Sequence, residues 1–353
     1  MVYHIRTIHE LMKNSNNLIR KWLWGVLKIA RNSKKPFTYG VDLGGTKIET
    51  VLVDATGFVL SRERHPTNLE QGAKGVINDI VNCVKNCMTD TEIEGEALGI
   101  GIAGQVDPST GTVIFGTNLG WRNVAIRSEL ENALEIPVVV TNDVRAAMWG
   151  EWMHGAGKGV NNFVILFVGT GIGGGIVSDG RVIKGCTGIA GELGHRTIVV
   201  DGRKCHCPNY GCLEAYAGGW AIAERAQEAV RTDLQAGKML IELAGSIDKI
   251  TAVHVSQAYN NDDLLSRRLM NETIHYLGSG VVGIVNAFNP CVLILGGGII
   301  EGFPELIEII EQTVRKYALE ASVERLQVVK AALGDDAGGI GAAALARSLA
   351  GEI

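Results

Sequence analysis

One pattern of strands and glycine turns occurs twice in this chain. The first copy, YGVDLGGTKIETVLVDATGFVLSRE at residues 39–63, reads as an apolar strand, a Gly44-Gly45 turn, a second strand, a polar turn and a third strand. The second copy, FVILFVGTGIGGGIVSDGRVIKG at residues 163–185, has the same order. Because a repeated supersecondary unit is typical of an internally duplicated architecture, the chain is predicted to fold into two related halves.

Helical and apolar strand patterns alternate outside these copies. Residues 75–88 and 124–134 have helical periodicity, and residues 97–102 and 137–140 are short apolar runs typical of buried strands. Such alternation predicts an α/β fold. With 353 residues, of which 46% are apolar and 20% charged, the chain can bury two cores.

Residues 1–36 differ in charge from the rest. They contain eight Lys or Arg and one Glu, a charge of +7 against −5 for the whole chain, so residues 37–353 carry −12. Residues 18–31 have the pattern of a cationic amphipathic helix, which could face a membrane, a partner or DNA, or simply pack on the body. The acidic body is not expected to bind nucleic acid, and the extension is too short for a complete helix-turn-helix domain.

The expected location is the cytoplasm. No apolar run approaches the ~20 residues that span a bilayer, and the N-terminus lacks a compact apolar stretch with a small-residue cleavage site. Three of the seven cysteines are crowded into one motif, which favours reduced thiols that bind a metal over a disulfide framework.

Both glycine turns have the composition of a phosphate-binding loop. Residues without a Cβ let successive backbone N–H groups approach phosphate oxygens closely. The turns comprise Gly44, Gly45, Thr46 and Lys47 in the first copy and Gly169, Thr170 and Gly171 in the second. Two such turns facing each other would grip a polyphosphate, although either could be a tight hairpin without a ligand.

A nicotinamide enzyme is an alternative, because Gly169, Gly171 and Gly174 match the dinucleotide fingerprint G-x-G-x-x-G. That fingerprint must open a helix, whereas here the chain soon enters a Ser-Asp-Gly turn at 178–180. A third glycine cluster, at 296–298, follows a strand and precedes a helical pattern, so it could lie against a base or ribose. No segment matches the P-loop pattern G-x-x-x-x-G-K-[ST].

Asp143 is the candidate catalytic base. It follows the apolar run 137–140 and precedes a helical pattern, which places it at the carboxyl end of a strand, where ligands of α/β proteins usually bind. Phosphoryl transfer requires a residue that orients the acceptor and takes its proton. In a competing interpretation, Asn142 or Asp143 only caps the helix.

A short cysteine-rich segment has the composition of a zinc site. Cys205, Cys207 and Cys212 with one histidine form a full tetrahedral set, which would stabilise an irregular loop. His195 is favoured as the fourth ligand, because His206 lies between two of the cysteines; thiols without a metal remain an alternative. A metal on one ring nitrogen of His195 would leave the other nitrogen for a substrate hydroxyl.

Glu192 and Glu214 flank this segment. Two ionised carboxylates beside an imidazole are well suited to binding adjacent hydroxyls of a sugar. A solvated surface would explain either glutamate alone, but their shared attachment to the metal segment favours a substrate pocket.

Four motifs in this order resemble those of the ROK family of repressors, open reading frames and kinases. They are DLGGTK at 42–47, GTGIGGG at 169–175, GELGH at 191–195 and C-x-C-x4-C-L-E at 205–214. The resemblance extends from about residue 37 to the end. It implies the actin-like ATPase (ribonuclease H-like) fold, with ATP and Mg²⁺ between two lobes, and a hexose phosphorylated on its 6-hydroxyl.

The resemblance also implies residue roles. Asp143 would be the catalytic base, and Asp42 would face the magnesium ion. The sugar would be bound by Gly104, Asn118, Asn142, Glu192, His195 and Glu214. The structural zinc would be bound by His195, Cys205, Cys207 and Cys212. The phosphates of ATP would be bound by Gly44, Gly45, Thr46, Lys47, Gly169, Thr170 and Gly171, and the third cluster, Gly296, Gly297 and Gly298, would complete the nucleotide site as inferred above. Pro208 departs from the family, which usually has glycine there, and puts the local turn in doubt but not the ligand set.

The family architecture suggests limits for the parts of the chain. We expect a basic extension at residues 1–36, a small lobe at 37–146 completed by a C-terminal helix within 339–353, and a large lobe with the zinc-binding loop at 147–338. A homodimer or homotetramer is expected.

Within the family, the residues favour a kinase. The repressor branch has an N-terminal winged helix-turn-helix, for which residues 1–36 are too short, and Asp143 is present. NLGWRN at 118–123 is similar to a loop of the family's glucokinases, so glucose is the expected sugar. The nearest alternative is a kinase of N-acylhexosamines (N-acetylglucosamine or N-acetylmannosamine). A sugar-responsive transcriptional regulator is the alternative from another class.

Overall fold

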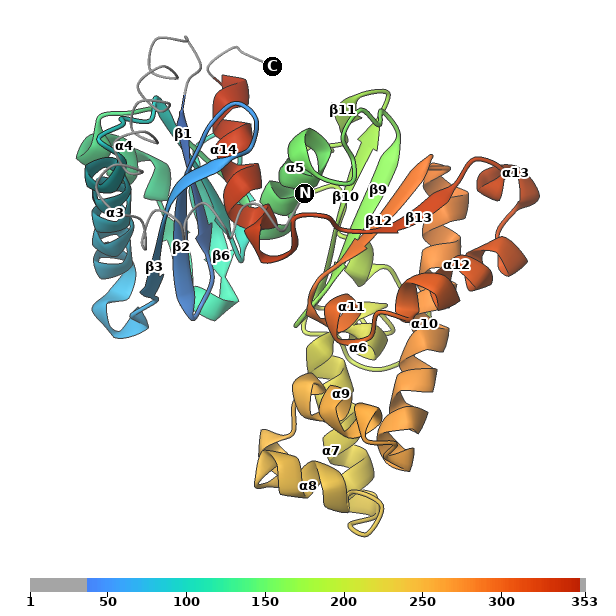
Figure 1. Cartoon of the computed structure of the whole chain (residues 1–353). Helices are drawn as coiled ribbons and strands as arrows, with labels where there is room; N and C mark the ends of the chain where they lie inside the picture. Colours follow the sequence, from blue (N-terminus) through green and yellow to red (C-terminus); the bar gives the residue numbers. More distant parts are fainter. Residues whose placement is uncertain (1–36, 350–353) are drawn as a thin grey trace, which may run out of the picture.

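The computed structural model describes residues 37–349, so the extension predicted at 1–36 and residues 350–353 lie outside the described part. This part forms two five-stranded mixed sheets with helices around them (Figure 1). Their strand orders, β3-β2-β1-β4-β8 and β11-β10-β9-β12-β13, are equivalent: three antiparallel strands are followed by two strands parallel to the third. The predicted duplication of an α/β unit is confirmed.

The strand bounds agree closely with the apolar runs of the sequence. The first sheet contains β1 (Thr38–Leu43), β2 (Lys47–Val53), β3 (Val59–Pro66), β4 (Ala97–Ile102) and β8 (Val138–Asn142). The second contains β9 (Phe163–Val168), β10 (Ile172–Ser178), β11 (Arg181–Val182), β12 (Val292–Gly296) and β13 (Gln327–Lys330). A small third sheet contains β5 (Gln105–Asp107), β6 (Thr112–Gly116) and β7 (Trp121–Val124).

Helices cover both faces of the first sheet. On one face, α3 (Gly72–Thr91) and α4 (Ile126–Leu134) share a buried apolar cluster with β1, β2 and β4. On the other face lies α14 (Ala337–Leu349), whose backbone approaches the strands so closely that a Cβ at Gly40 would meet the Gly339 carbonyl oxygen. This C-terminal helix begins at Ala337, two residues before the predicted start at Gly339.

The second sheet is also covered on two sides. Buried side chains of β9 and β12 pack on α7 (Gly219–Thr232), α10 (Leu264–Phe288) and α12 (Leu306–Tyr317). On the opposite side, Met148 of α5 (Asp143–His154) packs against Phe163 and Ile165 of β9.

The remaining elements are short and connect the layers. They are η1 (Leu69–Gln71), η2 (Thr117–Leu119), η3 (Leu193–His195), α6 (Glu214–Ala217), α8 (Lys238–Ala244), η4 (Ile247–Lys249), α9 (Ala252–Asn260), α11 (Gly298–Gly302), α13 (Glu320–Val323) and η5 (Gly334–Asp336). Across residues 37–349, no helix combines the length and apolarity that crossing a membrane requires.

Helices α5 and α14 cross between the two large sheets (Figure 1). A Cβ at Gly341 would lie 1.7 Å from the carbonyl oxygen of Ala146, so the two backbones touch at a glycine. The predicted lobe limit at 146/147 falls within α5, which packs on α14 and on the second sheet. The division into lobes at that residue stays a prediction.

Candidate active site and metal centre

The carboxyl ends of three adjacent parallel strands bring four predicted site residues together. Asp42 is the last residue but one of β1, Gly104 follows β4, and Asn142 and Asp143 lie where β8 passes into α5. The Asn142 side-chain amide donates to the Gly104 carbonyl at 3.3 Å, which links the β4 and β8 ends directly. This edge is where α/β folds present ligand-binding groups.

Asn142 caps α5, so the competing interpretation holds for this residue. Its side-chain oxygen accepts from the backbone N–H groups of Val144 at 3.0 Å and Arg145 at 3.3 Å. Asp143 is the first helical residue, and one of its carboxylate oxygens accepts from Val144 N–H at 2.9 Å. The cap fixes the start of the helix and thereby the position of the Asp143 carboxylate.

Two carboxylates at this edge have raised pKa values. Burial raises the pKa of Asp143 above 3.8, against the opposing effect of its hydrogen bonds from backbone N–H groups. Burial, together with the charge of Asp143, raises the pKa of Asp42 to about 6. The carboxylate of Asp42, which is partly buried, offers the oxygen donors that a divalent cation such as Mg²⁺ prefers.

The first glycine turn lies next to the predicted sugar residue Asn118. Gly44 N–H donates to the Lys47 carbonyl at 3.0 Å, which closes the turn between β1 and β2. A Cβ at Gly45 would lie 2.6 Å from the Asn118 carbonyl oxygen, so this turn contacts η2. Thr46 and Lys47 are exposed at its tip.

Lys47 belongs to an ion-pair network that the sequence did not reveal. Its ammonium lies 2.9 Å from the buried carboxylate of Glu49, which also pairs with Arg62 and, at 2.9 Å, with Arg64. Arg62 extends the network to Asp336, at 2.6 Å, just before α14. The predicted phosphate ligand is thus held by a carboxylate on its own strand.

The second glycine turn is built around Glu214. This buried carboxylate accepts from Ile172 N–H at 2.8 Å and from the Trp220 indole at 3.1 Å. A Cβ at Gly171 would lie 2.6 Å from a Glu214 oxygen. Glu214 therefore supports the 169–171 turn, a role that its sequence position did not indicate, and its predicted contact with a sugar stays a prediction.

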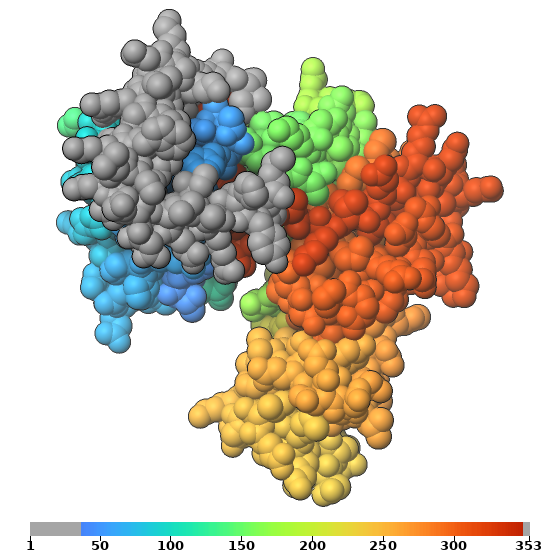
Figure 2. All heavy atoms as spheres, viewed as in Figure 1, coloured from blue at the N-terminus to red at the C-terminus, as the bar shows by residue number. Residues whose placement is uncertain are grey.

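The third glycine cluster lies beside the second turn. Strands β9 and β12 are adjacent and parallel, so residues 169–171 and 296–298 emerge at the same end of the sheet. Gly297 has φ 92°, and a Cβ there would lie 2.6 Å from the Val168 carbonyl oxygen. Figure 2 shows the surface hollowed between the blue and the yellow-orange parts of the molecule.

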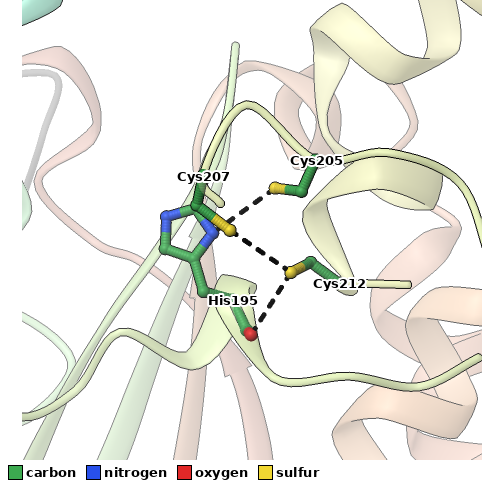
Figure 3. A group of neighbouring side chains, drawn as sticks. All are labelled: His195, Cys205, Cys207 and Cys212. Carbon is green, nitrogen blue, oxygen red and sulfur yellow. Dashed lines mark hydrogen bonds between the residues drawn. The ribbon is translucent and has the colours of Figure 1, made fainter. Parts of the chain in front are cut away.

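The four predicted metal ligands converge (Figure 3). One ligand atom of each of His195, Cys205, Cys207 and Cys212 lies within 4.8 Å of all the others. The Cys207 and Cys212 sulfurs are 3.6 Å apart, and the Cys205 sulfur is 3.6 Å from Nδ1 of His195. Tetrahedral zinc with ordinary bond lengths requires ligand separations of about 3.5–3.8 Å, and both of these separations lie in that range.

Of the two histidines, His195 and not His206 is grouped with the three cysteines. The His206 ring stacks on the Trp220 ring with centroids 3.9 Å apart, so it is engaged elsewhere. His195 turns Nδ1 towards the sulfurs and its other ring nitrogen away from them (Figure 3). Despite Pro208, the loop closes, because Cys205 N–H donates to the Asn209 carbonyl at 3.1 Å.

Glu192 lies just before η3 and is exposed. Arg145 of α5 donates to the carbonyl of Ala190, two residues before Glu192, at 2.6 Å. Sequence reasoning missed Arg145; the available signal was a cation in the first turn of a helix, where the helix dipole disfavours positive charge.

Comparisons with known proteins agree with this arrangement. Residues 38–349 match the model of the ROK family. The chain is 34% identical to the glucokinase of Streptomyces coelicolor over 312 residues, which are 88% of this chain and 97% of that protein. It is 28% identical to the xylose repressor of Bacillus subtilis over 312 residues, which are 88% of this chain and 77% of the repressor.

A solved structure shares the fold. The ROK family glucokinase from Streptomyces griseus, in complex with glucose and AMPPNP, is 35% identical, with a TM-score of 0.76 over 88% of this chain and 99% of that chain. The predicted actin-like fold is confirmed. Because the family model and this likeness both extend over most of its length, the chain belongs to the ROK family.

Proposed function

We propose that this protein is an ATP-dependent hexose kinase that phosphorylates the 6-hydroxyl of glucose. The observation that carries the proposal is the position of Asp143, a partly buried carboxylate at the same sheet edge as Asp42 and Gly104. A carboxylate whose pKa is raised is a better proton acceptor for an alcohol than an exposed one. The 34% identity to a glucokinase supports glucose as the acceptor.

Each step of the proposed phosphoryl transfer is assigned to side chains or backbone groups of this chain. Asp143 accepts the proton of the primary hydroxyl, and that oxygen attacks the γ-phosphorus in line while the bond to the β-phosphate oxygen breaks. Backbone N–H groups of the glycine turns 44–47 and 169–171 hold the phosphates, with Lys47 adding positive charge. Asp42 would bind magnesium, which supplies charge neutralisation when present.

In this proposal the metal cluster helps to bind the sugar, which is the phosphoryl acceptor. His195, Cys205, Cys207 and Cys212 would hold zinc, which fixes the orientation of the imidazole when bound. His195 would then present its outer ring nitrogen to a sugar hydroxyl, next to Glu192 and Glu214. Asn118, Asn142 and Gly104 would complete the sugar site, and residues 296–298 would lie against the nucleoside.

A sugar panel tests the proposal. ADP release is measured with ATP, Mg²⁺ and glucose, mannose, fructose, allose, N-acetylglucosamine or N-acetylmannosamine. The highest kcat/KM is expected with glucose, and the product should carry phosphate on the 6-hydroxyl. A higher value with an N-acetylhexosamine would assign the protein to the N-acylhexosamine kinases.

Because the chain is also similar to a xylose repressor, a second experiment tests for a transcriptional regulator. If none of the sugars accelerates ADP release, the kinase proposal is wrong. A gel-shift assay with genomic fragments, with and without sugar, then tests the regulator. No shift is expected from a kinase.

A further inference from the structure

Arg145 occupies a position that ordinary helix energetics disfavour. It lies in the first turn of α5, where unpaired N–H groups already give the helix end a partial positive charge. Its side chain is partly buried, and burial lowers the pKa of its guanidinium. A partly buried cation at a helix N-terminus requires compensation from groups outside that helix.

That compensation comes from the segment that carries Glu192. A guanidinium nitrogen of Arg145 donates to the carbonyl of Ala190 at 2.6 Å. The carboxylate of Glu192 acts on the pKa of Arg145 in the direction opposite to burial, so the two charges attract. The cation is therefore stabilised by a neutral acceptor and by a negative charge on one and the same segment.

The segment is exposed over much of its length, although Gly188 and Leu193 within it are buried. Residues 183–187 are exposed, as are Ile189 and Glu192. Its internal backbone contacts include Ala190 N–H to the Lys184 carbonyl at 3.1 Å and Leu193 N–H to the Gly191 carbonyl at 2.7 Å. Gly191 has φ 99°, which only glycine adopts readily. The hydrogen bond from Arg145 adds a contact between this exposed segment and the helix that begins at Asp143.

We propose that Arg145 is a positioning residue that holds the Glu192 segment at a fixed distance from the Asp143 carboxylate. Asp143 and Arg145 lie in one helical turn, so the hydrogen bond to Ala190 ties the sugar-binding segment to the turn that bears the base. The inference rests on the proposed function: Glu192 would grip ring hydroxyls while Asp143 receives the 6-hydroxyl. Arg145 thereby determines which hydroxyl of the sugar reaches the base.

Kinetics of Arg145→Met test this role, because methionine keeps much of the length and the apolar stem of the side chain but removes the charge and the donors. The KM for glucose should rise about 10-fold or more, as expected for loss of a charged hydrogen bond. The KM for ATP and the zinc content should stay unchanged. Arg145→Lys, which keeps one charged donor, should recover part of the loss. Arg181→Met, on an exposed arginine of β11, is the matched control.

A double-mutant cycle separates positioning from general destabilisation. If Arg145 acts through Glu192, then Arg145→Met in a Glu192→Gln background should raise the KM for glucose much less than in the wild type. Equal effects in both backgrounds would overturn the proposal.

Hydrogen exchange tests the same contact without using activity. Amides of residues 184–194 should exchange faster in Arg145→Met than in the wild type, while those of α14 and residues 197–212 should not. Unchanged exchange in 184–194 would overturn the proposal, even if glucose is phosphorylated. A wild type that phosphorylates no sugar would refute the proposed function, and exchange would still decide whether Arg145 holds the segment.

Discussion

Asp143 is the residue on which the proposed chemistry depends most. Asp143→Asn keeps the size of the side chain and the cap made by Asn142 but cannot accept a proton. We expect kcat to fall by about 10²–10⁴-fold, the usual contribution of a general base, while the Kd for glucose changes little. ADP release gives kcat, and calorimetric titration gives the Kd. Near-normal turnover would remove Asp143 from the mechanism.

The raised pKa of Asp143 sets the pH dependence. The base must be ionised, so activity is lost as the pH falls through its folded-state pKa. Because burial raises that pKa above 3.8, the acid limb of kcat/KM should lie above the range of an ordinary aspartate. The residual kcat/KM of Asp143→Asn should not fall with pH in the range where that of the wild type does. A wild-type rate that stays constant down to about pH 4 would contradict the assignment.

Asp42 should lower the stability of the free protein at neutral pH. Its pKa rises from 3.8 to about 6 on folding, so between these values the folded state binds more protons than the unfolded state. The free energy of unfolding therefore falls as the pH rises from 3.8 to about 6, because the protonated form of Asp42 is the one that the folded state favours.

Replacement of Asp42 tests this effect. Asp42→Asn should raise the free energy of unfolding by about 1–3 kcal/mol at about pH 7.5 and by much less at about pH 4.5. Urea unfolding without Mg²⁺ measures both values. The same variant should lose most Mg²⁺-dependent activity. An equal stability change at the two pH values would show that the charge of Asp42 is not the cause.

Among the elements, the loop of residues 195–212 has cysteines and backbone turns in place of a large apolar core, so a metal is expected to order it. Cys207→Ser should lose zinc and weaken glucose binding together, because the imidazole of His195 would lose its fixed orientation. Metal analysis and the Kd for glucose provide the two readouts. Cys291→Ser, on an exposed cysteine outside the cluster, should change neither. Loss of metal with unchanged affinity would make the site a purely structural one.

The strands and turns could be predicted because their signals are local. The run at 97–102 became β4 with the same bounds, and the glycine turns follow β1 and β9 where expected. The convergence of the four candidate metal ligands was also predictable, since three of them lie within eight positions. In contrast, the support of the second turn by Glu214 and the anchor from Arg145 to Ala190 join residues far apart in sequence. Such contacts depend on tertiary packing, which no local pattern specifies.

At the level of the whole molecule, the two halves are joined by α5 and by the segment between β13 and α14 (Figure 1). Glu151 of α5 connects these two links. Its fully buried carboxylate accepts from the backbone N–H groups of Leu333 at 2.8 Å, Ala332 at 3.0 Å and Ala156 at 2.8 Å. One side chain thus links α5 to the segment that follows β13 through two of these hydrogen bonds, while the third closes the end of α5.

Glu151→Gln tests whether this side chain couples the halves. Glutamine offers one acceptor oxygen where the carboxylate offers two, so at least one buried N–H should lose its partner, at a cost of about 1–3 kcal/mol. Urea unfolding should show this loss, with a broader transition as the halves unfold less cooperatively. Glu129→Gln, on an exposed glutamate of α4, should leave both unchanged. An unchanged midpoint and slope for Glu151→Gln would mean that the helix crossing at Gly341 holds the halves together without this carboxylate.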